Sequence, residues 1–209
     1  MWLVRAIFRL LYNEMAFSYD LVAWLVSMGH WGAWRRTAIL HACEGPLLDL
    51  AHGTGGLTAD LTRMGLAPVG LDLSPTMGRI TRRRLSNQRL PQRLVRGRAQ
   101  QLPFRSASFA NILMTFPADF VMDEQTLAAA ARILRPGGRL VIVVMGYLHA
   151  APLVRRLIDW AYDITTPRKL TEPDALARLQ QAGFLARWED ATLEGARARL
   201  LVATRCAGS

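Results

Sequence analysis

The chain has 209 residues, with 26 Lys and Arg against 16 Asp and Glu, which gives a formal net charge of +10. A hydrophobic fraction of 51% excludes a disordered chain, and the length fits one globular domain with a full core. Two cysteines, Cys43 and Cys206, are too few for a disulfide scaffold, so we interpret them as structural and expect a reducing cytoplasm. The basic surplus fits nucleic acid, an anionic membrane surface, or solubility alone.

The first 45 residues are predicted to be helical and are rich in aromatic side chains, with no proline before Pro46. Their apolar run over 1–12 is interrupted by Arg5 and Arg9. A bilayer span needs about 20 predominantly apolar residues, so we expect neither a transmembrane helix nor a secretory signal. The same run suits a membrane interface, so a cytoplasmic protein resting on the inner face of the membrane is the alternative localisation.

From Pro46 onward, short apolar runs alternate with helical segments. Ser74-Pro75 is typical of a helix start, and Thr171 with Asp174 resembles a capping box. This alternation predicts an α/β fold with a parallel sheet and right-handed crossovers. The last two strands have no helix between them, which predicts an antiparallel pair at one edge. Strands are expected over 47–50, 68–73, 94–95, 109–116, 140–145, 184–189 and 199–204, and helices over 57–64, from 75, over 123–134 and over 175–181.

A glycine turn after the first strand carries the strongest functional signal. Residues 47–58 read LLDLAHGTGGLT, a buried strand that enters a glycine turn and opens a helix. Asp72 ends the second strand, 19 residues after Gly53, where a carboxylate can accept from both ribose hydroxyls of an adenosine cofactor. A nicotinamide site needs a third glycine at the position of Thr58. The pattern D-x-A-x-G-x-G is instead that of enzymes that use S-adenosylmethionine.

Further motifs follow in the order found in one known family. They are VGLDLSPTM over 69–77, GRAQQLPF over 97–104, FANI over 109–112 and ARILRPGGRL over 131–140, together with Tyr12-Asn13, Tyr19-Asp20, Ser27-Met28-Gly29 and Trp34-Arg35-Arg36 in the N-terminal segment. Over nearly its whole length the chain resembles the ubiquinone/menaquinone C-methyltransferase-like group of class I methyltransferases. The resemblance implies a Rossmann-like seven-stranded sheet, with a helical lid over 1–45 and a cofactor-binding core over 46–209 in a single domain.

The resemblance also implies a set of site residues. In this family Asp49 would orient the methionine end of S-adenosylmethionine, Asp72 would hold the ribose, and a helix containing Tyr19 would close over the site. The expected cofactor contacts are Asp49, Ala51, His52, Gly53, Gly55, Asp72, Leu73, Met77, Ala99, Gln100 and Thr115. S-Adenosylhomocysteine would be the product, and no metal is expected.

The chain departs from the family pattern at three places. The family has glycine where this chain has Ala51, which we expect to be a mild change because the turn needs a small residue more than a left-handed backbone. Arg98 replaces a carboxylate that would accept from the adenine amino group, so Gln100 or the Ala99 backbone would have to substitute. The segment 115–120 lacks the Arg-Asn pair of quinone methyltransferases, which weakens the case for quinone chemistry.

Catalytic residues are harder to infer, because methyl transfer from a sulfonium needs mainly positioning and water exclusion. Tyr19 is either a lid contact or a catalytic acid. His149 is either a base or an ordinary loop histidine. His52 either faces the methionine end of the cofactor or only fills the turn.

Three functions remain open from the sequence. The first is methylation of a small or lipidic acceptor. The second is nucleic-acid methylation through the basic surplus; the segment after the fourth strand does not match adenine N6 enzymes, so a nucleic-acid partner is not favoured. The third is a non-catalytic protein that binds the cofactor or a membrane. The charge is uneven, since nine arginines and no acidic residue lie between Asp72 and Asp119. That stretch is either a solvated face or a surface for an anionic partner.

Overall fold

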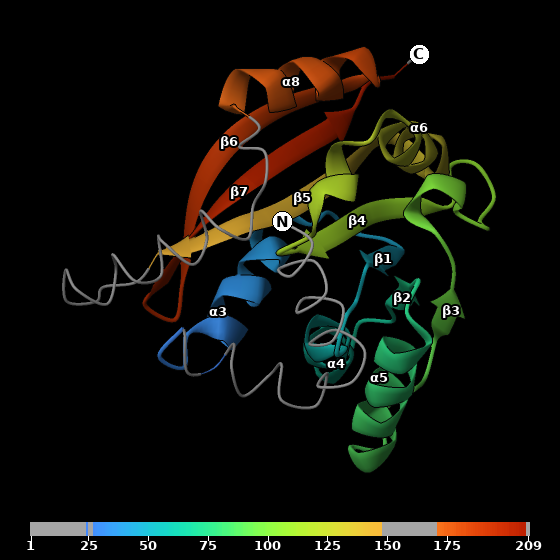
Figure 1. Cartoon of the computed structure of the whole chain (residues 1–209), viewed down its shortest axis with the longest axis vertical. Coiled ribbons are helices and arrows are strands. Elements are labelled where there is room, and N and C mark those ends of the chain that lie inside the picture. The colour runs from blue at the N-terminus through green and yellow to red at the C-terminus, as the bar shows by residue number, and fades with distance from the viewer. Residues whose placement is uncertain (1–23, 25–26, 148–170, 208–209) are drawn as a thin grey trace, which may run out of the picture.

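The fold was analysed in a computed structural model that describes residues 24, 27–147 and 171–207 (Figure 1). The N-terminal segment contributes α3 (Trp31–Arg36) and a 3-10 helix, η1 (Thr37–His41), as its helical composition predicts. Tyr19, His149 and the apolar run over 1–12 lie outside the described residues, so their roles stay predictions. No helix in the described part of the chain is long and apolar enough to cross a bilayer.

Seven strands form one sheet in the order β3-β2-β1-β4-β5-β7-β6. The pairs from β3 to β5 are parallel, whereas β7 is antiparallel to both β5 and β6. The expected α/β class, the mostly parallel sheet and the antiparallel edge pair are therefore confirmed. The strands are β1 (Leu47–Leu50), β2 (Val69–Asp72), β3 (Leu94–Arg96), β4 (Phe109–Thr115), β5 (Leu134–Tyr147), β6 (Phe184–Leu193) and β7 (Ala196–Arg205).

Helices cover both faces of the sheet. On one face the helices are α6 (Glu124–Ile133) and α8 (Glu172–Gln181), and on the other α3 and α4 (Gly56–Arg63) (Figure 1). Successive strand residues point to opposite faces, so Ile112 and Met114 enter the first core and Leu113 enters the second. Both faces of β4 are therefore buried, as its continuous apolar sequence indicates.

Local start signals act as predicted. Ser74 caps α5 (Pro75–Asn87) by accepting a hydrogen bond from the Met77 backbone N–H, and proline occupies the first turn. Thr171 caps α8 in the same way, through the N–H of Asp174. The Asp174 carboxylate accepts a hydrogen bond from the Thr171 hydroxyl and not from the Thr171 backbone N–H. Only half of the predicted capping box therefore forms.

Several element ends differ from the prediction. β5 begins at Leu134 rather than at residue 140, because Leu134 already pairs with Phe109 before the register shifts at the following turn. Gly137 has a φ of +75°, and a β-bulge with such a glycine lets a strand continue through a Pro-Gly-Gly sequence that would otherwise end it. β6 and β7 are each 10 residues long, because a tight hairpin turn between them extends their pairing beyond the apolar core of either strand.

Candidate active site

The glycine turn follows β1 directly, and its backbone is held against β2. Ala51 N–H and His52 N–H both donate to the Leu71 carbonyl, at 2.7 and 3.3 Å. This pairing leaves Ala51 with a φ of +60°, in the left-handed region. The expectation that alanine is a mild replacement here is therefore wrong, because the position requires a left-handed backbone, which disfavours any residue with a Cβ.

Gly55 is required for packing rather than for lining a cavity. It adopts a φ of +75°, and a Cβ there would lie 2.3 Å from Thr81 Cγ2 on α5. The Thr81 hydroxyl donates to the Gly53 carbonyl at 2.9 Å. The turn is therefore fixed from behind by α5 while its Gly53 side stays open.

Asp49 is a buried carboxylate in the middle of β1. Its Oδ2 accepts from the Thr58 hydroxyl at 2.5 Å, which leaves Oδ1 without a hydrogen bond among the described residues. Burial raises the pKa of this carboxyl above its ordinary value, and the Thr58 hydrogen bond opposes that rise. A buried carboxylate with an open oxygen favours a cationic neighbour, such as an ammonium group.

Asp72 stands at the carboxyl end of β2, as predicted. Its Oδ2 accepts from Gly53 N–H at 2.9 Å and its Oδ1 accepts from Ser74 N–H at 2.8 Å. These two bonds fix the carboxylate plane. Each oxygen keeps lone pairs for a further donor, so the group can still accept from a pair of vicinal hydroxyls.

A cavity of about 300 Å³ lies at the carboxyl ends of β1, β2 and β4. The structure brings nine of the eleven expected cofactor residues to its wall, whereas Asp49 and Gly55 lie behind the turn. His52 has its Nδ1 2.9 Å from the Gly53 carbonyl and 3.2 Å from the Thr81 hydroxyl. Its ring is therefore engaged within the turn. The expected residues that line the cavity are Ala51, His52, Gly53, Asp72, Leu73, Met77, Ala99, Gln100 and Thr115.

One end of the cavity is aromatic and apolar. Trp31 from α3 and Phe116 after β4 stack with ring centroids 4.2 Å apart, and Pro117 and Phe120 lie on the same wall. Phe116 has a φ of +50°, so its backbone is strained. Its N–H donates to the Val143 carbonyl at 2.8 Å, which fixes it in this conformation.

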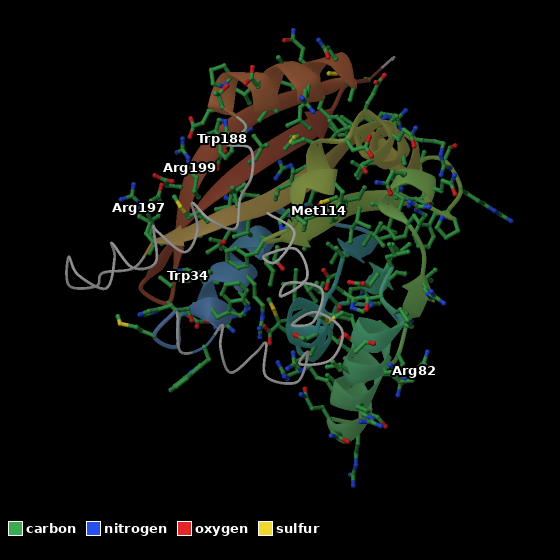
Figure 2. All side chains as sticks on the ribbon, viewed as in Figure 1. Trp34, Arg82, Met114, Trp188, Arg197 and Arg199 are labelled. Carbon is green, nitrogen blue, oxygen red and sulfur yellow. The ribbon has the colours of Figure 1, made fainter. Side chains whose placement is uncertain are left out.

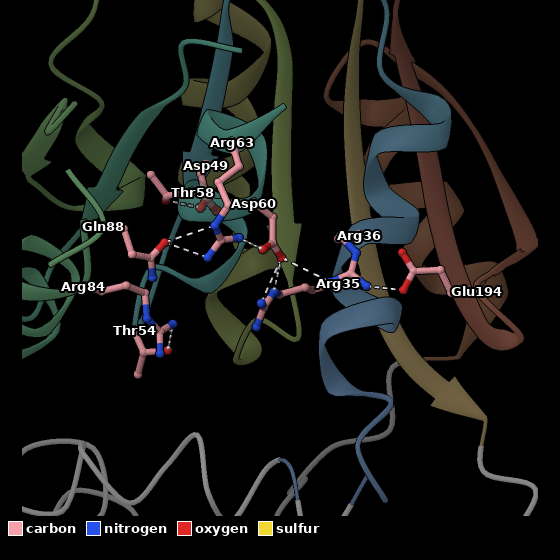
Figure 3. Close-up of polar contacts among 10 residues, drawn as sticks. All are labelled: Arg35, Arg36, Asp49, Thr54, Thr58, Asp60, Arg63, Arg84, Gln88 and Glu194. Atoms are coloured by element: carbon pink, nitrogen blue, oxygen red, sulfur yellow. Dashed lines mark hydrogen bonds and ion pairs between the residues drawn. The ribbon is translucent and has the colours of Figure 1, made fainter. Parts of the chain in front are cut away.

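An arginine from the N-terminal segment also reaches the cavity. Arg35 on α3 lies over Gly56, where a Cβ would lie 2.4 Å from its Nη1. Its Nε and Nη2 each lie 2.9 Å from Asp60 Oδ2 (Figure 3). Arg36 and Arg63 contact the same carboxylate. Asp60 therefore orients Arg35 and leaves its Nη1 without a hydrogen bond among the described residues.

The opposite end of the cavity carries the second departure from the family pattern. Arg98 is exposed at the rim, and Gln100 Nε2 donates to Asp123 Oδ2 at 3.0 Å. This bond engages the amide nitrogen, so Gln100 Oε1 remains available as a hydrogen-bond acceptor. The geometry thus offers an acceptor at this end, as the sequence requires if Arg98 cannot supply one.

Comparisons with known proteins agree with this geometry. A model of the methyltransferase domain family matches residues 48–142. The chain is 33% identical over 189 residues to a demethylmenaquinone methyltransferase from Thermobifida fusca, covering 86% of this chain and 79% of the relative. It is 32% identical to the ubiquinone/menaquinone biosynthesis C-methyltransferase UbiE of Pectobacterium carotovorum, over 70% of this chain and 60% of the relative.

The chain belongs to the class I S-adenosylmethionine-dependent methyltransferases, in the ubiquinone/menaquinone C-methyltransferase group. A solved S-adenosylmethionine-dependent methyltransferase from Thermotoga maritima has the same fold, with a TM-score of 0.65 and 19% identity over 91% of this chain and 96% of that one. Both the predicted family and the predicted cofactor, S-adenosylmethionine, are thereby confirmed.

Several residues on the cavity wall of this methyltransferase were not predicted from the sequence. Trp31, Arg35 and Phe116 come from segments that are distant from the glycine turn in the chain, so no local pattern connects them. The one available signal was the match of Trp34-Arg35-Arg36 to the family, which marked the segment without a role. Thr54 also lines the cavity, as does Arg98, which the sequence marked only as a departure from the family pattern.

Proposed function

We propose that this methyltransferase transfers the methyl group of S-adenosylmethionine to a ring carbon of a small, lipid-soluble acceptor of the quinol type. The observation that carries the proposal is the stacked Trp31–Phe116 wall at one end of the cavity. A flat apolar wall favours a flat apolar ring, because aromatic faces stack in offset geometry. The names of the relatives point to the same acceptor class.

The residues present fit the family cofactor. Asp49, which does not line the cavity, keeps an oxygen without a hydrogen bond among the described residues and would attract the ammonium group of the methionine end. Arg35, which lines the cavity, would suit the carboxylate. Asp72 would hold the ribose, and Gln100 Oε1 would accept from the adenine amino group. Leu73 and Met77, together with Ala99, would flank the adenine. When bound, the cofactor supplies an electrophilic methyl group on a sulfonium.

The protein's own contribution is placement and exclusion of water. Thr115 ends β4 and Phe116 follows it, and both line the cavity. An acceptor ring packed against Phe116 would have its reacting carbon held facing the cofactor. Methyl transfer would then proceed as an effectively unimolecular step. A quinol hydroxyl would give up its proton to make the ring carbon nucleophilic, and the C–H bond at that carbon would then break, releasing its proton as the ring regains aromaticity. His52 is engaged within the turn, so Tyr19 and His149 stay the proposed proton carriers.

We further propose that the enzyme works in the cytoplasm against the inner face of the membrane, because a lipidic acceptor resides there. Residues 1–45 would act as a lid over the cavity, and the apolar run over 1–12 would lie at the interface. Flotation of the chain with and without residues 1–12 tests the second point. Unchanged partitioning would contradict it.

The test of function has two steps. Calorimetric titration with S-adenosylhomocysteine should show one site per chain, and its absence would contradict the cofactor assignment. Incubation with S-adenosylmethionine and a reduced, prenylated naphthoquinone lacking one ring methyl should then yield a product heavier by one methylene. A Phe116→Ala variant should bind the cofactor and lose turnover. Turnover only with a non-lipidic amine would contradict the acceptor class.

A further inference from the structure

The arginine-rich stretch between Asp72 and Asp119 forms one surface. Most of its side chains lie on α5, on the loop that follows, or on the edge strand β3. Eight of the nine are exposed, and Arg84 is half-buried. The exposed members are Arg79, Arg82, Arg83, Arg89, Arg93, Arg96, Arg98 and Arg105.

The exposed arginines of this surface share a lack of acidic partners in the part of the chain that the structure describes. Among the described residues, none of the eight exposed members pairs with a carboxylate. By contrast, Arg197 and Arg199 on β7 both pair with Asp190, and Arg199 also pairs with Glu172. Figure 2 shows the two kinds of arginine far apart, with Arg82 on α5 at the lower right and the β7 pair at the upper left. Arg197 and Arg199 are therefore neutralised by acidic partners, whereas the eight exposed arginines of this stretch have none among the described residues.

A second cavity, of about 320 Å³, opens in this surface between α5 and β3. Arg79, Arg82 and Arg96 line it, together with Ser74 at the start of α5. Arg79 donates to Thr76, Arg96 donates to the Leu73 carbonyl, and Arg82 makes no hydrogen bond among the described residues. The cavity is open beside Gly78, where an added Cβ would meet no atom within 4 Å.

The one carboxylate on the wall of this cavity is Asp72, and its charge is already stabilised. Both of its oxygens accept from backbone N–H groups, those of Gly53 and Ser74. Three guanidinium groups therefore outnumber one carboxylate that is held toward the glycine turn. The cavity favours a compact anion with several oxygen acceptors, because guanidinium groups match phosphate in geometry.

We infer that this cavity binds the phosphodiester of an anionic phospholipid and that α5 and β3 thereby rest on the membrane surface. Of the residues lining it, His52 alone carries an aromatic ring, and it is engaged within the turn. Binding of single-stranded nucleic acid relies on rings that stack with bases, so a headgroup fits better than a nucleotide. The choice of a lipid over another phosphodiester rests on the proposed function, since a lipidic acceptor requires the enzyme to reach a membrane.

The experiment compares two triple variants of the full chain with the same net charge. Arg79→Gln, Arg82→Gln and Arg96→Gln remove the cavity arginines, whereas Arg135→Gln, Arg187→Gln and Arg197→Gln remove exposed arginines elsewhere. Co-sedimentation is measured with phosphatidylcholine vesicles with and without phosphatidylglycerol. Each arginine near an anionic surface contributes about fivefold, so the cavity triple should lose on the order of 100-fold in partitioning and the matched triple far less. Thermal melts establish that both triples fold.

Two further arms separate the alternatives. Inorganic phosphate at constant ionic strength should compete with the vesicles for the wild-type chain. Equal losses in both triples, or no competition by phosphate, would overturn the inference. Tighter binding to a single-stranded RNA than to vesicles, lost in the cavity triple, would assign the surface to nucleic acid instead. Titration of the cavity triple with S-adenosylhomocysteine should match the wild type, which separates this inference from the cofactor assignment.

Discussion

At the scale of single residues, Ala51 occupies a position where the family has glycine and the backbone is left-handed. Its φ of +60° costs an alanine about 1 kcal/mol relative to glycine, because the Cβ crowds the neighbouring carbonyl. Ala51→Gly should therefore raise the free energy of unfolding by about 1 kcal/mol and the melting temperature by roughly 2–4 °C. The helical Ala59→Gly is the matched control and should have the opposite sign. If both variants lower the melting temperature, the left-handed conformation of Ala51 is not strained.

Asp49 is expected to trade stability for binding. Since burial raises the pKa of this carboxyl above 3.8, the folded protein holds the proton more tightly than the unfolded chain does. Its contribution to stability is complete below the unfolded pKa and is lost as pH rises through the folded pKa. Asp49→Asn should remove this decline in the ligand-free protein and weaken binding of S-adenosylhomocysteine at neutral pH. Urea unfolding from pH 4 upward measures the slope, and an unchanged slope in the variant would contradict the assignment.

At the scale of elements, Asp60 couples α3 to α4, the helix that follows the glycine turn. If Arg35 Nη1 binds the cofactor carboxylate, Arg35→Gln should weaken S-adenosylhomocysteine binding by about 10-fold, which corresponds to the loss of one charged hydrogen bond. It should leave 5′-methylthioadenosine, which lacks the amino-acid group, unaffected. Arg36→Gln is the matched control, because Arg36 contacts the same Asp60 without lining the cavity. Equal losses for both ligands would assign Arg35 a purely structural role.

Elements that depend on local signals were predictable, whereas contacts across the chain were not. The Ser74-Pro75 start of α5 and the strand before the glycine turn depend on neighbouring residues, and both formed where expected. The Trp31–Phe116 wall depends on how α3 packs against the end of β4, which no periodicity encodes. The φ of Ala51 depends on a bond to Leu71 in another strand. Local sequence thus predicts the cofactor end of the site better than the acceptor end.

At the scale of the whole molecule, nearly all of the charge of +10 comes from one stretch of the chain. The acid-free stretch contributes nine arginines, and the rest of the chain carries 17 basic and 16 acidic residues, a surplus of one. Three arginines on β6 and β7, by contrast, pair with acids on β6 and α8. If the cavity between α5 and β3 binds a phospholipid headgroup, as inferred above, this uneven charge would turn α5 and β3 toward the membrane surface.

An unpaired arginine face should also reduce stability at low ionic strength. On α5, Arg79 has like charges three and four residues further on, at Arg82 and Arg83, and such pairs are destabilising by about 0.2–0.5 kcal/mol each. Arg83→Gln should therefore raise the free energy of unfolding by roughly that amount in dilute buffer. The gain should vanish near 1 M salt, where the Debye length is about 3 Å. Arg197→Gln, which removes a paired arginine, should lower stability in dilute buffer instead. Urea unfolding at the two salt concentrations measures both effects, and a salt-independent gain for Arg83→Gln would mean that repulsion along α5 is not its source.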